Sequence, residues 1–237
     1  MNDSSIRSQV DMLRARVESE LSTPAVLVVT SAKRGDGKSL VAHGLAETFA
    51  EARYRVLLVD ANAANPEIPD LPKVTRLDGG FDDKAYPIRR LESYEALSLT
   101  DPRLASATPR EAVEATTAWL RARYDVVIVD AAPVGASTLA LLFAGCADAT
   151  LLALRLGRRA GDEDAAAIGA LERINARVLG VVATTAAAAR TFAKREREPA
   201  RPAMPSLVTA GTMPFVETIT GDDRTRPARG RVSAEAS

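Results

Sequence analysis

The sequence has little of several residue types that often carry catalysis or covalent stabilisation. It contains one cysteine and one histidine among 237 residues. The single cysteine, Cys146, excludes an internal disulfide and favours a reducing, cytoplasmic location. The single histidine, His43, has no cysteine, serine or carboxylate at a spacing typical of a catalytic pair, so we interpret it as a packing or surface residue.

Aromatic residues are also few, and the chain has no formal net charge. Aromatic residues make up 4% of the chain and hydrophobic residues 46%, so the core must be largely aliphatic. Basic and acidic residues number 31 each, and this balance gives no direct signal for nucleic acid. No apolar run approaches the roughly 20 residues that span a bilayer, and the opening residues are polar. We therefore expect a soluble cytoplasmic protein.

What the sequence does contain is a glycine-bearing loop after an apolar run. Residues 26–39 read VLVVTSAKRGDGKS, and a helical pattern follows. The glycines would let backbone N–H groups turn inward around an anion, and the helix would point its positive end at the same place. Lys38 would reach phosphate oxygens and Ser39 would hold magnesium. The loop departs from the usual G-x-x-x-x-G-K-S/T form, because Ala32 takes the first position and Lys33 follows it.

Two later segments predict buried strands that end in aspartate. Residues 55–62 read RVLLVDAN and residues 124–130 read YDVVIVD. Continuous apolar runs are typical of strands covered on both faces of a parallel sheet. Ligands bind at the carboxyl ends of such strands, where Asp60 and Asp130 would lie. The loop and the two aspartates together predict a site for a magnesium-bound nucleotide.

The remaining pattern alternates strands with helices from residue 25 to residue 184. This predicts an α/β fold with a doubly wound, mostly parallel sheet and helices on both faces. We divide the chain into an amphipathic leading helix in residues 1–24, a nucleotide-binding domain in 25–185 and a proline- and arginine-rich tail in 186–237. The tail is expected to lack regular structure, apart from apolar spots at Leu207-Val208 and Phe215-Val216 that could dock elsewhere.

Three segments together resemble the deviant Walker-motif P-loop ATPases, and among these the bacterial tyrosine kinase branch linked to capsule and exopolysaccharide synthesis. TSAKRGDGKS is similar to the phosphate loop of that branch, RVLLVDAN to its second Walker-type motif, and YDVVIVDAAPV to its Walker B strand. The motifs occur in the family's order, and the resemblance spans roughly residues 6–185.

The resemblance implies a role for each matching residue. Lys38 would bind the β- and γ-phosphates of ATP, and Asp60 could accept the proton of an attacking hydroxyl. The implied metal ligands for Mg²⁺ are Ser39, Asp60 and Asp130. The implied catalytic residues are Lys33, Lys38, Asp60 and Asp130, and the implied nucleotide-binding residues are Lys33, Arg34, Gly35, Asp36, Gly37, Lys38, Ser39 and Leu40.

Three departures keep alternative functions open. Asn62 stands where the kinases have a second aspartate, and no tyrosine lies after Tyr124, so the C-terminal tyrosine cluster of the kinases is absent. Lys33 matches a lysine of the septum-positioning and plasmid-partitioning ATPases, which reaches the partner's nucleotide across a dimer. The leading hypothesis is a capsule-type kinase that uses magnesium in phosphoryl transfer or ATP hydrolysis, with degenerate kinase activity. The alternatives are a positioning ATPase that dimerises through Lys33 and a non-catalytic nucleotide-binding regulator.

The resemblance also implies partners. Beyond ATP and Mg²⁺, it implies a homo-oligomer and a membrane polysaccharide-assembly protein, through which an otherwise cytoplasmic chain would associate with the membrane.

Overall fold

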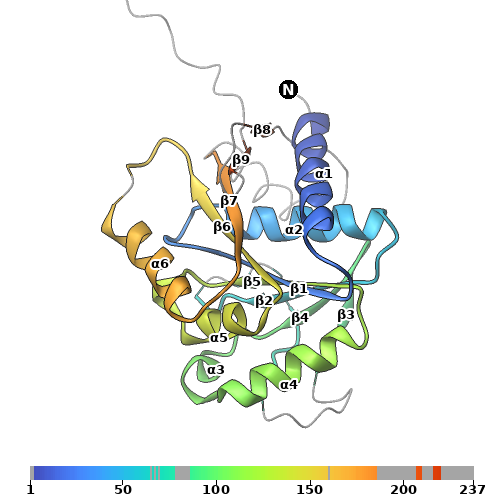
Figure 1. Ribbon diagram of the computed structural model, residues 1–237. Coiled ribbons are helices and arrows are strands. Elements are labelled where there is room, and N and C mark those ends of the chain that lie inside the picture. Colours follow the sequence, from blue (N-terminus) through green and yellow to red (C-terminus); the bar gives the residue numbers. More distant parts are fainter. Residues whose placement is uncertain are drawn as a thin grey trace, which may run out of the picture.

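The computed structural model describes residues 3–64, 66, 68, 70–77, 86–159, 161–185, 207–209 and 216–219. A central sheet lies between two layers of helices (Figure 1). The strands are β1 (Ala25–Ser31), β2 (Val56–Ala61), β3 (Arg89–Arg90), β4 (Glu95–Ser98), β5 (Val126–Ala131), β6 (Ala149–Arg155), β7 (Val178–Thr184), β8 (Leu207–Thr209) and β9 (Val216–Ile219). The helices are α1 (Asp3–Glu20), α2 (Lys38–Glu51), α3 (Pro102–Ala107), α4 (Arg110–Arg121), α5 (Thr138–Cys146) and α6 (Asp162–Arg173), with a 3₁₀ turn η1 (Val134–Ala136).

The strand order in the sheet is β3-β4-β2-β5-β1-β6-β7-β9-β8. Neighbouring strands run parallel except at the two edges, where β3 pairs antiparallel with β4 and β8 pairs antiparallel with β9. The predicted doubly wound α/β fold is therefore confirmed. Its parallel strands all point their carboxyl ends to one edge, which is where this class of sheet binds ligands.

Alternate residues of the central strands pack into two separate cores. Leu27 and Val29 of β1 join the core formed with α1 and α2, whereas Val26 and Val28 join the core formed with α4 and α5. A strand places successive side chains on opposite faces, so an uninterrupted apolar run fills both cores at once. Helix α6 packs beside α5 in a third, smaller cluster around Leu152 and Leu171.

The leading helix forms an additional layer over α2. Ile6, Val10 and Leu13 of α1 are fully buried in the core that includes α2. The two helices approach closely at Gly44, where an added Cβ would lie 3.2 Å from Val10 Cγ2. None of the helices in the described residues combines the length and apolar character needed to cross a membrane.

Two segments of the tail differ from the expected lack of regular structure. Residues 216–219 pair parallel with β7, and residues 207–209 then pair antiparallel with β9. The edge of β7 offers unpaired backbone groups to which further strands can add. Leu207, Val208 and Val216 thus lie in strands of the chain's own sheet, while Phe215 and the rest of the tail after Thr185 lie outside the described residues.

Candidate phosphate-binding site

The loop between β1 and α2 turns at the carboxyl edge of the sheet. Gly35 and Gly37 have φ angles of 83° and 86°, a region that side-chain-bearing residues rarely adopt. Gly37 is also confined in space, because an added Cβ would lie 2.6 Å from Thr184 Oγ1 at the end of β7. The glycine at this position is therefore required both by its backbone conformation and by its neighbour.

Two hydroxyl groups hold the carbonyl groups of this loop. Thr184 Oγ1 donates to the carbonyl oxygen of Asp36 at 2.7 Å, and Ser31 Oγ donates to the carbonyl oxygen of Lys33 at 2.7 Å. In a trans peptide the N–H points away from the C=O, so fixing the Asp36 carbonyl towards β7 directs the Gly37 N–H to the opposite side. Amide groups fixed in this way can form an anion-binding concavity at the start of α2.

Lys38, Ser39 and Asp130 meet beneath the loop. Lys38 begins α2, and its Nζ lies 3.5 Å from Asp130 Oδ1 and 3.2 Å from Ser39 Oγ. Asp130 lies near the end of β5, and its side chain is 0% exposed. The lysine ammonium group offsets the charge of this buried carboxylate, since an ion away from water needs a partner of opposite sign.

Asp60 lies beside Asp130 at the same edge of the sheet. The two residues are register partners in the β2–β5 ladder. Asp60 Oδ1 accepts a hydrogen bond from the backbone N–H of Asn62 at 3.1 Å. The side chains of Asp60 and Asn62 are both buried. Ser98, at the end of β4, is the register partner of Asp60, and its hydroxyl lies 2.8 Å from that of Thr100 just beyond the strand. Polar side chains therefore cross the carboxyl ends of β4, β2 and β5 in a row.

The oxygen donors at this edge fit a magnesium ion. Ser39, Asp60 and Asp130 supply a hydroxyl and two carboxylates, which are the hard ligands that Mg²⁺ prefers. Within the described part of the chain, no three histidine, cysteine or acidic side chains gather closely enough to hold a metal by themselves. Because Mg²⁺ commonly keeps waters and binds substrate phosphates alongside one or two carboxylates, this donor set suits a site that a nucleotide completes.

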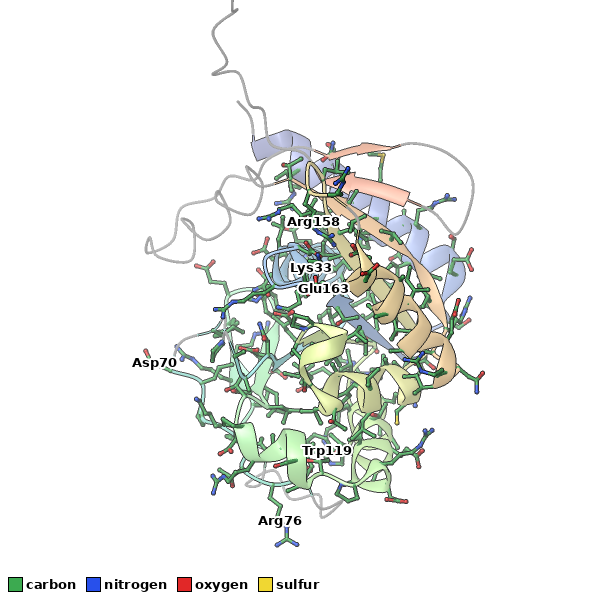
Figure 2. The ribbon with its side chains drawn as sticks, turned by 90° about the vertical axis from the view of Figure 1, so that its left-hand side faces the viewer. Lys33, Asp70, Arg76, Trp119, Arg158 and Glu163 are labelled. Carbon is green, nitrogen blue, oxygen red and sulfur yellow. The ribbon has the colours of Figure 1, made fainter. Side chains whose placement is uncertain are left out.

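The other predicted loop residues lie apart from this group. Lys33 Nζ forms an ion pair with Glu163 Oε2 of α6 at 2.5 Å, and Figure 2 shows the two residues next to each other. Arg34 is exposed on the loop. The Leu40 side chain is buried in the core beneath α2, so its backbone N–H is the part that could meet a ligand.

A charged network that joins the loop to α6 was not predicted from the sequence. Arg158, between β6 and α6, donates from Nε to Asp36 Oδ1 and from Nη2 to Asp36 Oδ2, both at 2.8 Å. The same guanidinium donates from Nη1 to Asp164 Oδ2 at 2.7 Å and lowers the pKa of Asp164 to about 2. The polar run GRRAGDED at residues 157–164 was the only signal in the sequence, and it is equally typical of an exposed loop.

His43 is a packing residue on α2. Its side chain is buried, and Nδ1 lies 3.0 Å from the hydroxyl of Tyr94. Burial, with a smaller contribution from the charge of Lys38, lowers the pKa of His43 to about 4. The imidazole is therefore neutral near pH 7, so no further positive charge is added beneath the loop.

Comparison with known proteins finds bacterial tyrosine kinases. No protein-family model matches the chain. The chain is 26% identical over 166 residues to the tyrosine-protein kinase YwqD of Bacillus subtilis, covering 66% of this chain and 70% of YwqD. It is 26% identical over 187 residues to the putative tyrosine-protein kinase CapB of Staphylococcus aureus, covering 75% of this chain and 80% of CapB. The chain resembles the bacterial tyrosine kinases.

The fold of this kinase group is also the fold of the chain. The kinase domain of the Escherichia coli tyrosine kinase ETK superposes with a TM-score of 0.62 over 75% of this chain and 74% of that domain, at 21% identity. The resemblance inferred from three short motifs thus extends to the architecture that positions them.

Proposed function

We propose that the chain binds ATP with Mg²⁺ at the loop between β1 and α2 and is a P-loop enzyme of the capsule-associated tyrosine kinase type. The observation that carries the proposal is the meeting of Lys38, Ser39 and Asp130 beneath the loop, with Lys38 Nζ within 3.5 Å of an oxygen of each of the other two residues. A buried cation between a hydroxyl and a carboxylate, below a glycine-bearing loop at the start of a helix, matches the needs of a magnesium-bound triphosphate.

Each residue contributes to positioning and charge. The amides of residues 35–40 would hold phosphate oxygens, and Lys38 would bind the β- and γ-phosphates. Ser39, Asp60 and Asp130 would hold Mg²⁺, which neutralises the charge that develops on the phosphates during transfer. Asp60 could take the proton of the attacking hydroxyl, whether that of a tyrosine or of water. Phosphoryl transfer depends mainly on such positioning and neutralisation, so no nucleophilic side chain is required.

A transfer assay with γ-labelled ATP tests the proposal. The wild-type chain is expected to release labelled phosphate or to transfer it to tyrosine, and Lys38→Met is expected to do neither. The thermal midpoint of Lys38→Met should be measured as well, so that loss of activity is separated from loss of folding. A folded wild-type chain that binds ATP but neither hydrolyses it nor transfers phosphate would instead support the non-catalytic regulator, for which Asn62 is the motivating residue.

Lys33 favours a second function, that of a positioning ATPase which dimerises on binding ATP. In that function the lysine would contact the nucleotide of a partner copy. Its side chain is 32% exposed, so it lies at a surface from which a second copy could be reached. Turnover that rises with chain concentration and is lost in Lys33→Ala would favour this function over the kinase.

Further features of the proposal rest on the kinase resemblance. We propose that the unit formed by residues 25–185 carries the chemistry and that the leading helix in residues 1–24 packs on it. We also propose that the chain forms a homo-oligomer in the cytoplasm and works with a membrane polysaccharide-assembly protein. Cross-linking of the full chain with and without ATP would test the oligomer.

A further inference from the structure

Asp36 places a carboxylate inside the loop that is proposed to bind phosphate. It lies between Gly35 and Gly37, and it is 1% exposed. Negative charge at this point opposes the binding of a triphosphate, because the repulsion between like charges is poorly screened away from water. A phosphate loop with a buried acid therefore needs a specific means of cancelling that charge.

Arg158 supplies positive charge to Asp36 from the segment between β6 and α6. Its Nε and Nη2 each donate to a separate oxygen of Asp36 at 2.8 Å, which is the bidentate geometry of strong charge-assisted hydrogen bonds. The Arg158 side chain is 11% exposed. The two residues are 122 positions apart in the sequence, so the pair joins the loop after β1 to the segment that follows β6.

Asp164 orients Arg158 from the adjoining edge of the guanidinium. Arg158 Nη1 donates to Asp164 Oδ2 at 2.7 Å, and Nη2, which also bonds Asp36, donates to Asp164 Oδ1, so one cation is shared between two carboxylates. Asp164 Oδ2 also accepts the N–H of Gly161 at 2.9 Å. Asp164 lies in the first turn of α6, so this carboxylate is itself held by a rigid element. The neighbouring ion pair between Lys33 and Glu163 also lies between the loop and this turn of α6, and Figure 2 shows Lys33, Glu163 and Arg158 grouped together.

We propose that Arg158 is a positioning residue that makes the loop competent to bind phosphate, by offsetting the charge of Asp36 and fixing the loop against the start of α6. This inference rests on the proposed function, because it concerns the same site. Arg158 acts through Asp36, so its effect on nucleotide affinity should depend on the presence of the Asp36 charge. That dependence separates this role from direct contact between Arg158 and the nucleotide.

A double-mutant cycle tests the inference with ADP and Mg²⁺ as the probe. The dissociation constant is measured by calorimetry for the wild type, Arg158→Met, Asp36→Asn and the double variant, together with each thermal midpoint. Arg121→Met is the matched control, because Arg121 pairs with Asp148 at 2.9 Å at the amino end of β6, far from the loop. Its thermal midpoint should fall while the dissociation constant stays at the wild-type value.

We expect the following changes in the dissociation constant across this cycle. Arg158→Met should weaken binding about ten- to hundredfold, which is the size of an uncompensated charge a few ångströms from the phosphates at an intermediate dielectric constant. Adding Asp36→Asn should return the dissociation constant to within about threefold of the wild type, because the repelling charge is gone. If Arg158→Met does not fold but the double variant folds and binds normally, Arg158 is needed only while Asp36 carries its charge and does not itself contact the nucleotide.

Three results would overturn the inference. One is unchanged affinity in Arg158→Met. Another is a double variant that binds as weakly as Arg158→Met, which would mean that Arg158 acts on the nucleotide directly. The third is a wild-type chain that does not bind ADP with Mg²⁺ at all. This last result contradicts the proposed function itself and is recognised from the wild-type measurement alone, whereas the first two leave the proposed function standing.

Discussion

Lys33 and Glu163 form an ion pair within one chain, with Lys33 Nζ 2.5 Å from Glu163 Oε2. The Lys33 side chain is 32% exposed and the Glu163 side chain 68% exposed, so water screens the pair. Exposed pairs contribute only about 0.2–1 kcal/mol, and opening this one would cost little. The contact holds Lys33 against its own α6 without preventing it from reaching a second copy.

Removing this ion pair should distinguish the two enzymatic functions. If the chain is a kinase-type enzyme, ATP turnover by Lys33→Ala and by Glu163→Gln should each stay within about twofold of the wild type, since an exposed pair adds little to stability or charge. The measurement is phosphate release at several chain concentrations. A loss of more than tenfold in Lys33→Ala, with a gain in Glu163→Gln, would instead identify Lys33 as a group that acts on a partner's nucleotide.

Replacing Gly37 by alanine should damage the loop more than replacing a glycine of similar conformation elsewhere. Gly37 has a φ of 86°, and an added Cβ would lie within 3 Å of three Thr184 side-chain atoms. Gly157 has a φ of 80° and nothing within 4 Å of the added atom. We expect Gly157→Ala to lose about 1–2 kcal/mol of unfolding free energy from backbone strain, and Gly37→Ala about 2–5 kcal/mol from strain and overpacking.

Urea denaturation of both glycine variants gives these values directly. Gly37→Ala should also fail to bind ATP, because its loop must move away from Thr184. Equal destabilisation in the two variants would show that the contact with Thr184 does not constrain the loop.

Asp130→Asn should weaken the dependence of ATP binding on magnesium. The substitution keeps the size of the side chain but removes the charge that would hold the metal and that now faces Lys38. Turnover should fall on the order of 100-fold or more, as expected when a charge that stabilises the transition state is lost. Asp125→Asn is the matched control, because Asp125 lies at the amino end of the same strand and pairs with Arg55.

Calorimetry with ATP, in magnesium and in EDTA, measures this effect. The ratio of the two affinities should shrink in Asp130→Asn and stay at the wild-type value in Asp125→Asn. Were the ratio unchanged in Asp130→Asn, this carboxylate would not be a metal ligand.

His43 should make the protein less stable as the pH falls from 6.5 to 4. Its folded-state pKa is lowered to about 4 from 6.5, mainly by burial, while Lys38 and the hydroxyl of Tyr94 are its charged and titratable neighbours. The unfolded chain binds a proton at His43 in this interval and the folded chain does not, so protonation favours unfolding. The free energy of unfolding is therefore unaffected by this titration above pH 6.5, and it falls by about 2–3 kcal/mol by pH 4.

Urea denaturation across this pH interval, compared between the wild type and His43→Asn, checks the prediction. The variant has no group that titrates at this position, so its pH dependence should be flatter. The pKa of Asp164 is lowered from 3.8 to about 2, so the stability that its ionised form provides is lost only below about pH 3.8. The titration of His43 between pH 6.5 and 4 can therefore be measured separately. Parallel curves for the two proteins between pH 6.5 and 4 would contradict the buried, neutral histidine.

The sequence predicted those parts of the fold that follow from local pattern. The strands ending in Asp60 and Asp130 could be located because unbroken aliphatic runs are typical of strands buried on both faces. Their alignment side by side was a consequence of the parallel sheet. Helix α3 was missed although its signals were present, with Asp101 capping the helix and Pro102 at its first position, because its six residues are too few to show a helical apolar period.

Contacts between distant segments could not be predicted in this way. Nothing near Arg158 in the sequence indicates that it pairs with Asp36, because the pairing exists only once β1 and β6 are neighbours. Strands β8 and β9 depend likewise on the open edge of β7, since their own residues form a short and weakly apolar pattern. Side-chain partners across the sheet therefore had to come from the structure.

The central claim is that Lys38, Ser39, Asp60 and Asp130 form a site for magnesium-bound ATP. Calorimetric titration of the full chain with ATP, in magnesium and in EDTA, tests this claim most directly, with Lys38→Met as the control. We predict one nucleotide per chain in the wild type, tighter binding with magnesium, and at least a tenfold loss of affinity in the folded Lys38→Met variant. Absence of binding in the wild type, or equal affinity in the wild type and Lys38→Met, would contradict the claim.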